Sequence, residues 1–225
     1  MISSIPPAAI LIIGAFLIPF LKGRQKSVYL LLLPAIAFIK VLIMPEGSHW
    51  TIGFLDYDII FSRADRMSKV FGYIFTLMSF IGTLYALHLK NEDLQHVAAF
   101  LYAGSALGVV FAGDMLSLFV FWEIMTIAST YLIWRRGSEA SYTAGLRYIL
   151  VHLFGGLCLL AGIVLHVHQT GSIEFGLIGL NGLASSLILV GFGVNCAFPV
   201  LHAWLPDAYP EATVTGTVFL SAFTT

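Results

Sequence analysis

Long apolar segments without charged residues are the feature that most restricts how this chain can fold. A bilayer core about 30 Å thick is crossed by ~20 apolar residues in a helix. Seven such segments occur within the 225 residues, and an eighth begins near residue 212 and runs to Thr225. We therefore expect an all-α integral membrane protein with about eight transmembrane helices, the last incomplete. The seven spans lie at 5–21, 27–44, 70–89, 94–112, 115–134, 143–165 and 180–201.

Composition supports this interpretation. Hydrophobic residues make up 59% of the chain and charged residues 10%, whereas soluble domains have ~45–50% and ~25%. A net charge of −1 gives no sign of a nucleic-acid partner. Both cysteines, Cys158 and Cys196, fall inside predicted spans, and neither a CxxC motif nor a Gly-rich phosphate loop occurs. The sequence thus predicts no cofactor, no metal site and no redox ligand.

Basic residues predict the orientation of the chain in the membrane. No Lys or Arg precedes Lys22, and the cluster of Lys22, Arg24 and Lys26 follows the first span. Because basic loops stay in the cytoplasm, we expect an uncleaved first helix with its N-terminus extracytoplasmic. The loops at 90–93 and 135–142 then share the cytoplasmic side. The predicted location is the cell inner (plasma) membrane.

One long polar stretch, 45–69, interrupts the spans. The alternation in TIGFLDYDIIF favours a short extracytoplasmic strand or hairpin. We expect it to be an ordered loop that covers the outer surface.

Glu123 is the charged residue that lies deepest in a predicted span. It follows the start of its helix by about 12 Å, at ~1.5 Å per residue, and a carboxylate there costs at least ~2.5 kcal/mol. Thr126 and Thr130 extend the same helix face. A proton or cation carrier is the favoured role, and a hydrogen-bonded structural Glu is the alternative. Asp114, at the start of this span, fits a helix N-cap.

The span at 143–165 begins with Arg147, Tyr148 and His152. Arg147 lies near the cytoplasmic end, where its side chain can extend to the interface. His152 lies deeper. Its imidazole could relay protons, or it could be an interhelical hydrogen-bond partner, and both interpretations stay open.

A helix break is predicted within 188–211. Pro199 interrupts an apolar helix, and such breaks in membranes often line a cavity. Asn195 lies one turn before the break and His202 just after it, while Trp204 is expected as an interfacial anchor. An ordinary proline kink is the alternative to an ion pathway.

Three motifs carry a resemblance to a known family. FVFWEIMTIAST, HAWLPDAYPEAT and GTVFLSAFTT resemble the antiporter-like membrane subunits. These include the Mrp-type cation/proton antiporters, the proton-pumping subunits of respiratory complex I and subunits of energy-converting hydrogenases. The similarity runs from about Asp65 to Thr225 and is strongest in 97–135 and 191–225. The segment LHLKNEDLQHVAAFLYAGSALGVVFAGD is similar to the D-like branch of the Mrp type.

The resemblance implies a fourteen-helix core with two inverted five-helix repeats, each with a half-channel and a broken helix. This chain would contain the first repeat, whose broken seventh helix falls on 180–209. The family's proton-carrying Glu falls on Glu123. The implied organisation is two helices and an outer loop at 1–69, a third helix at 70–93, and the proton-conducting repeat at 94–225.

One departure from the family pattern concerns the broken helix. The family usually places a Lys there as the partner of its Glu, but this chain has Asn195 or, aligned on the proline, Val194. A neutral residue removes the positive charge that would favour the ionised Glu. Our hypothesis is that His152 or His202, with waters near Asn195, takes over the relay.

A second departure is length, because the chain reaches only the first repeat. We expect a fragment, or a split gene whose second chain supplies the rest. The predicted function is that of a membrane subunit in a proton-translocating complex, exchanging a monovalent cation (Na+) for protons, with other membrane subunits as partners. The chain itself would not be an enzyme. The alternatives are a proton-pumping subunit of a redox-driven complex and a non-conducting scaffold subunit.

Overall fold

The computed structural model describes residues 5–223, and helices make up most of them. Five helices are long and apolar enough to cross a membrane. They are α2 (Gly23–Ile43), α3 (Arg66–Ala86), α4 (Asp93–Phe111), α5 (Met115–Trp134) and α6 (Glu139–Thr170). The shorter helices are α1 (Pro7–Ala15), η2 (Ile18–Phe20), α7 (Leu183–Asn195), α8 (Trp204–Ala208), η3 (Tyr209–Glu211) and α9 (Val214–Phe223).

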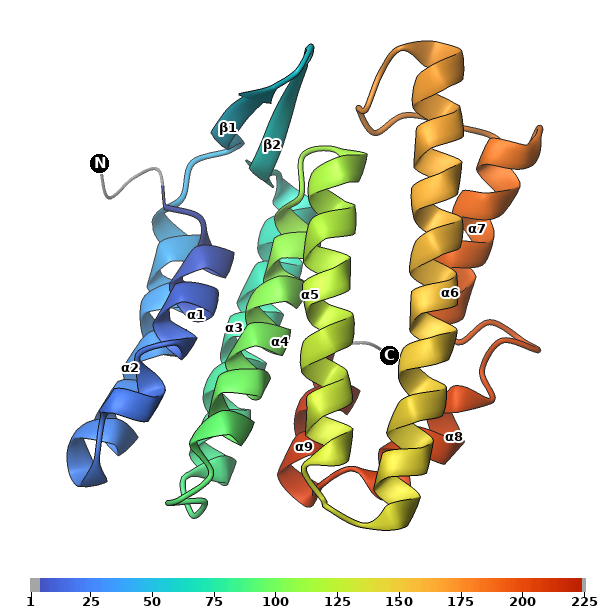
Figure 1. Cartoon of the computed structure of the whole chain (residues 1–225). Coiled ribbons are helices and arrows are strands. Elements are labelled where there is room, and N and C mark those ends of the chain that lie inside the picture. Colours follow the sequence, from blue (N-terminus) through green and yellow to red (C-terminus); the bar gives the residue numbers. More distant parts are fainter. Residues whose placement is uncertain (1–4, 224–225) are drawn as a thin grey trace.

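The helices pack side by side as a bundle (Figure 1), with α1 and α2 at one side, α3 to α5 in the middle, and α6 and α7 at the other side. The centre is occupied by α4, which packs against α1, α3 and α5. Thirteen of its nineteen residues are buried, so its apolar sequence is explained by contact with other helices on nearly every side. The predicted all-α membrane architecture is confirmed.

Prolines shorten two of the predicted spans. The first, expected at 5–21, is helical only to Ala15 and continues as the 3₁₀ helix η2, and the seventh, expected at 180–201, ends at Asn195. Each helix stops four residues before a proline, Pro19 or Pro199. Proline lacks an N–H and its ring clashes with the carbonyl four residues earlier. These two segments are therefore shorter than predicted.

The sixth span is longer than predicted. Instead of 143–165, α6 covers Glu139–Thr170. A reciprocal capping box between Ser138 and Ser141 starts it, and Gly171, with φ 72°, ends it in the left-handed conformation. Both capping signals lie in the polar flanks, which hydropathy does not weigh.

The polar stretch at 45–69 forms an antiparallel hairpin of β1 (Gly47–Phe54) and β2 (Tyr57–Ala64), as predicted. It is fastened to the start of α5: the Ile60 N–H donates to Asp114 Oδ2 (2.6 Å), and the Gly113 N–H donates to the Ile60 carbonyl (2.9 Å). Asp114 Oδ1 accepts from the Ser117 N–H (2.8 Å), which confirms Asp114 as the N-cap of α5.

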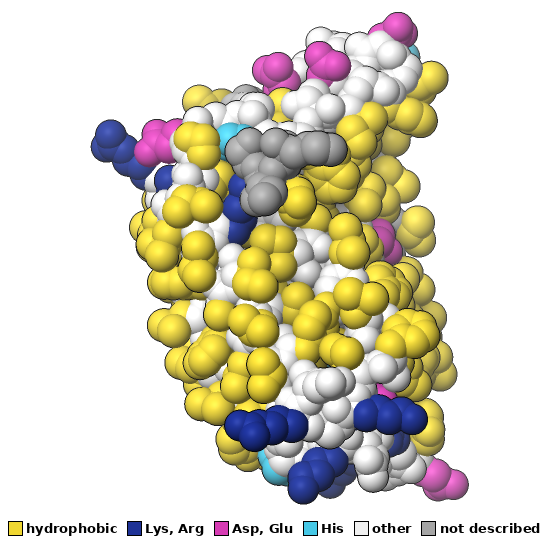
Figure 2. Space-filling view, turned by 90° about the vertical axis from the view of Figure 1, so that its left-hand side faces the viewer, with side chains coloured by type: hydrophobic (Ala, Val, Ile, Leu, Met, Phe, Trp, Pro, Cys, Tyr) yellow, Lys and Arg dark blue, Asp and Glu magenta, His cyan; other side chains and the backbone are white. Residues whose placement is uncertain are grey.

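Charged side chains gather at the two ends of the bundle. Figure 2 shows a hydrophobic band between them on the face formed by α1 and α2. The loops that basic residues assigned to one side do lie together, at the end opposite the hairpin (Figure 1). Among the described residues, four ion pairs link segments there: Lys26–Asp93, Arg135–Glu92, Arg136–Glu211 and Arg147–Asp207.

Candidate functional site

Glu123 projects from α5 toward α6. The residue is partly buried, and its Oε1 atom is fully buried without a hydrogen-bond partner among the described residues. It lies against Gly156 of α6, where a Cβ atom would collide with Oε1. Gly156 therefore provides the space that the carboxyl group occupies between the two helices.

Further buried polar atoms without a hydrogen-bond partner come from α5, α6 and the neighbouring helix α7. Buried polar atoms nearly always have a hydrogen-bond partner in the protein or in ordered water. Within residues 5–223, however, none is present for Trp122 Nε1, Thr126 Oγ1, His152 Nε2 or the amide group of Asn195. Trp122 and Thr126 belong to α5, His152 to α6 and Asn195 to α7. Groups of this kind need polar partners, and ordered water is the usual partner of buried polar atoms that the protein does not satisfy.

The register of α5 and α6 places these groups at neighbouring levels. The two helices run antiparallel, and the Tyr148 hydroxyl of α6 donates to Ser129 Oγ of α5 (2.9 Å). Glu123 faces Gly156 two turns away. Thr126 and His152 lie between these two contacts on their helices. The polar groups therefore follow the α5–α6 interface along the bundle axis.

The orientation of the His152 ring is fixed on three sides. Its Nδ1 lies 2.9 Å from the Tyr148 carbonyl, which assigns the proton to Nδ1 and leaves Nε2 as an acceptor. The ring stacks on Tyr148 with 3.9 Å between centroids and meets the Trp204 ring edge-on at 4.5 Å. A fixed acceptor nitrogen, unsatisfied by the described residues, is suited to accept a proton or a hydrogen bond from water.

Helix α7 brings Asn195 close to this interface. Gly155 of α6 allows the close approach of α7, because a Cβ there would lie 3.0 Å from Val194. Trp122 and Phe192 pack edge-on at 5.2 Å and connect α5 with α7. Asn195, 5% exposed, is the last residue of α7. Glu123, His152 and Asn195 therefore lie on three neighbouring helices, of which α6 packs against both α5 and α7.

The predicted helix break lies directly after Asn195, the last residue of α7. Ala197 and Val200 have φ of 50° and 78°, a region that a β-branched residue such as Val rarely adopts. Pro199 lies between them and is exposed. His202 is also exposed and does not join the buried polar groups, so the structure places it apart from Glu123, His152 and Asn195.

Trp204 differs from the sequence expectation. Rather than anchoring at the interface, it is 4% exposed, and its indole N–H donates to the Val194 carbonyl (2.9 Å). At the end of α7 the Val194 carbonyl also accepts from the Ala197 N–H (3.3 Å), and Trp204 adds a side-chain donor to it. Sequence reasoning also missed the parts played by Trp122, Tyr148 and Gly156. The pair Gly155–Gly156, one turn after His152, was a signal for a close helix contact at that level.

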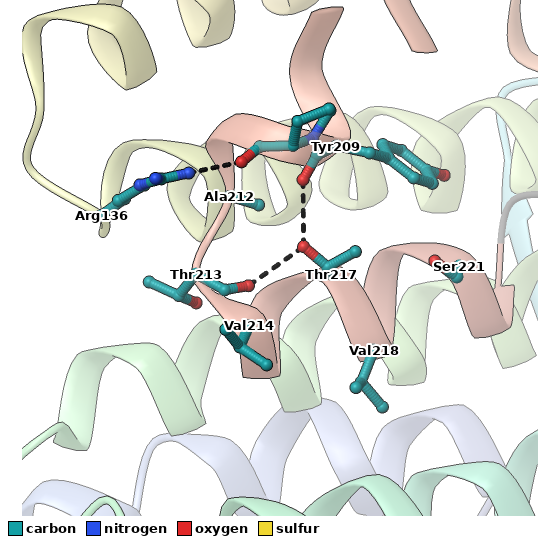
Figure 3. Close-up of a pocket in the computed structure, with 9 residues that line it drawn as sticks. Arg136, Tyr209, Ala212, Thr213, Val214, Thr217, Val218 and Ser221 are labelled. Carbon is teal, nitrogen blue, oxygen red and sulfur yellow. Dashed lines mark hydrogen bonds between the residues drawn. The ribbon is translucent and has the colours of Figure 1, made fainter. Parts of the chain in front are cut away.

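A pocket of about 870 Å³ lies at the charged end, between the α8–α9 connection and α9. Figure 3 shows Thr213, Thr217 and Ser221 at successive turns of this segment, with Thr217 Oγ1 donating to the carbonyls of Tyr209 (3.0 Å) and Thr213 (3.1 Å). Arg136 closes one side by donating to the Pro210 carbonyl. The lining of the pocket is mainly apolar, and it contains none of the predicted site residues.

Comparison with known proteins places the chain in a family. The family model for the transmembrane region of NADH:quinone oxidoreductase/Mrp antiporter proteins matches residues 112–225, half of the chain. The chain belongs to this family. The predicted resemblance is thereby confirmed, and the chain is a multi-pass membrane subunit of the antiporter-like type.

Two curated relatives illustrate the range of the family. The A component of the Na(+)/H(+) antiporter of Alkalihalophilus pseudofirmus is 30% identical over 230 residues, which cover 88% of this chain and 28% of the relative. The N component of NADH-quinone oxidoreductase of Deinococcus radiodurans is 29% identical over 162 residues, covering 67% of this chain and 33% of the relative. The chain thus spans about a third or less of the length of these relatives. Its similarity to the D-like branch in particular stays a prediction.

Solved structures share the fold. A chain of the Mrp complex from Dietzia sp. superposes with a TM-score of 0.82 at 23% identity, covering 97% of this chain and 26% of that one. A chain of the archaeal membrane-bound sulfane sulfur reductase superposes with a TM-score of 0.82 at 23% identity, covering 97% of this chain and 50% of that one. A chain of respiratory complex I from Thermus thermophilus superposes with a TM-score of 0.73 at 24% identity, covering 97% of this chain and 52% of that one. The expected antiporter-like fold is confirmed.

Proposed function

We propose that this chain is part of a multisubunit complex in the plasma membrane that exchanges a monovalent cation, Na+, for protons. Its N-terminus is extracytoplasmic, and it works with other membrane subunits. Two helices and the hairpin form 1–69, a third helix 70–93, and the conducting repeat 94–225. In this proposal the chain itself carries out transport and no redox chemistry.

The observation that carries the proposal is the buried, unsatisfied polar set around Glu123. A carboxyl oxygen, a threonine hydroxyl, an imidazole nitrogen and an amide group without partners among the described residues form an expensive arrangement inside a membrane. Water molecules between these groups would satisfy them and form a hydrogen-bonded path for protons. The name of the Alkalihalophilus pseudofirmus relative, which describes it as part of a Na(+)/H(+) antiporter, supports the choice of exchanged ions.

Each group has a distinct part in the proposed half-channel. Glu123 takes up and releases the proton, and His152 accepts it through Nε2. Asn195, at the end of α7, holds water by its amide group without adding charge. Because this helix end carries no Lys, proton movement would not depend on opening a Glu–Lys ion pair. The helix break at Asn195–Pro199 provides backbone carbonyls to the same path.

The test is Glu123→Gln in the intact complex, measured in everted membrane vesicles. Adding NaCl to vesicles with a pre-formed pH gradient collapses that gradient if antiport occurs. We expect Glu123→Gln to abolish the collapse, because an amide cannot exchange the proton. Glu46→Gln is the matched control, since Glu46 lies at the outer end and forms a loose 3.8 Å contact with Arg66. Normal transport by Glu123→Gln would refute the half-channel.

A proton-pumping role in a redox-driven complex is the second candidate. It is favoured by the Deinococcus radiodurans relative, which is part of NADH-quinone oxidoreductase. The antiporter role and the redox-linked role differ in what drives transport. A redox-linked subunit moves protons only during electron transfer and does not respond to NaCl alone. Genes for other Mrp-type subunits beside this one would favour antiport, and genes for iron–sulfur or nickel-site subunits would favour the second candidate.

A non-conducting scaffold is the third candidate, prompted by Asn195 in place of Lys. If the chain conducts through an adapted path, Asn195→Lys lowers antiport, because the new charge disturbs the relay. A scaffold tolerates both Asn195→Lys and Glu123→Gln.

A further inference from the structure

The five-residue helix α8 is joined to α6 by a two-point ion pair. Arg147 Nε lies 2.7 Å from Asp207 Oδ2, and Arg147 Nη2 lies 2.8 Å from Asp207 Oδ1. Such a fork-to-fork contact fixes the orientation of both partners as well as their distance. Because α6 is a continuous 32-residue helix, it provides a rigid support to which α8 is attached.

Trp204, three residues before Asp207, connects α8 with the buried polar set. Its indole N–H donates to the Val194 carbonyl (2.9 Å) at the end of α7, and its ring packs on those of His152 (4.5 Å) and Tyr148 (5.4 Å). One side chain therefore caps the broken helix and limits the rotation of the His152 ring. Any shift of α8 would disturb both contacts together.

We propose that Arg147 and Asp207 are positioning residues for proton transfer: their ion pair holds α8 on α6, so that Trp204 keeps the end of α7 and the His152 ring in the conducting arrangement. This inference rests on the proposed function, because it concerns the same polar groups. It adds residues that lie outside the polar set itself.

The surroundings of the pair support a role in transport. A pocket of about 400 Å³ lies beside it at the charged end of the bundle, lined in part by Glu139, Thr143 and Glu211 as well as by the pair itself. His152 is one turn beyond Tyr148 on α6, and its ring packs against the ring of Trp204. With α8 in place, Trp204 covers His152 on the side of this helix. The pair thus controls how closely α8 covers the imidazole.

A purely structural account predicts a different outcome. Arg147 and Asp207 are partly exposed, with 59% and 36% of their side-chain surfaces accessible, and exposed ion pairs contribute little to stability. If the pair were only structural, breaking it would leave transport per complex nearly unchanged. If it positions α8, breaking it lowers the transport rate while the complex still assembles.

The experiment uses the intact complex in everted vesicles, with transport normalised to the amount of complex by immunoblotting. We expect Asp207→Asn and Arg147→Gln each to lower the maximal rate of NaCl-driven collapse of the pH gradient by ~10-fold or more, as misplacement of reacting groups does. The half-saturating NaCl concentration should not change, because neither residue belongs to the path. The exchanged pair Arg147→Asp with Asp207→Arg should recover much of the rate.

Two further variants sharpen the result. Trp204→Phe keeps an aromatic ring but removes the N–H that caps α7, and we expect it to lower the maximal rate as Asp207→Asn does. Glu92→Gln is the matched control: it breaks the Arg135–Glu92 ion pair at the same end, away from α8, and should transport normally.

The outcomes separate this inference from the proposed function. Normal transport per complex by Asp207→Asn, or no recovery in the exchanged pair with the complex present in normal amount, overturns the positioning role. If Glu123→Gln is inactive while Asp207→Asn is normal, the proposed function stands and only the positioning role fails. If Glu123→Gln transports normally, the half-channel itself fails.

Discussion

Replacing Gly156 by Ala tests the Glu123–α6 contact most directly. A Cβ at this position would overlap Glu123 Oε1. To restore ordinary contact the carboxyl group must move by about 1 Å. The perturbation is therefore a displaced but chemically intact Glu123.

The effects on stability and on transport should differ. Gly→Ala inside a helix gains ~1 kcal/mol in propensity, while moving Glu123 off its rotamer or compressing the contact costs ~1–3 kcal/mol. These contributions partly cancel, so assembly and thermal stability should change little. Misplacing a reacting group by about 1 Å can lower a rate ~100-fold. We therefore expect a loss of transport of roughly 10- to 100-fold, with a nearly normal amount of complex.

The assay is the NaCl-driven collapse of the pH gradient in everted vesicles, with the melting temperature of the purified complex measured in parallel. Leu157→Ala is the matched control, because Leu157 is the next residue on α6 and is 66% exposed on the outer surface of the bundle. A Gly156→Ala complex that transports at the wild-type rate would show that the position of Glu123 at this contact does not matter, and would refute the reasoning.

Two further predictions concern the helix caps. Asp114→Ala removes both the N-cap of α5 and the acceptor for the Ile60 N–H, so we expect a loss of ~2–3 kcal/mol, measured as a lower melting temperature, with Asp114→Asn less affected. At Asp65, the N-cap of α3, the Ser68 backbone N–H lowers the pKa of the carboxyl group below its ordinary value of 3.8. Its stabilising contribution is complete above pH 3.8 and is lost as the pH falls through the lowered pKa. Asp65→Ser retains a cap that does not titrate, so a melting temperature that falls equally steeply with acid in this variant would contradict the assignment.

Most of the membrane architecture could be predicted from local sequence signals. Apolar segments of bilayer length predicted the five long helices, alternation predicted the hairpin, and Asp114 at the head of an apolar run predicted its N-cap. The predicted lengths were wrong where local chemistry overrode hydropathy. Pro19 and Pro199 ended helices early, and the Ser138 cap and Gly171 made α6 longer than its apolar core.

The candidate site was only partly predictable. Glu123, His152 and Asn195 attracted attention because polar groups in apolar spans are costly, and the structure brings their helices together. His202 was proposed on its proximity in sequence to the break, yet the chain turns so that its side chain is exposed. Trp204 was expected at the membrane interface, but it is buried in the bundle, where its indole N–H donates to the Val194 carbonyl.

The sequence by itself determined that the chain lies in a membrane and that Glu123 is its most unusual charge, because a carboxyl group within an apolar span is costly whichever helices surround it. Tertiary structure decided which groups meet. The gap at Gly156 that admits Glu123, the link from Tyr148 to Ser129, and the ion pair from Arg147 to Asp207 join residues on different helices. Such contacts depend on helix rotation and register, which packing of the whole bundle sets and which no single segment encodes.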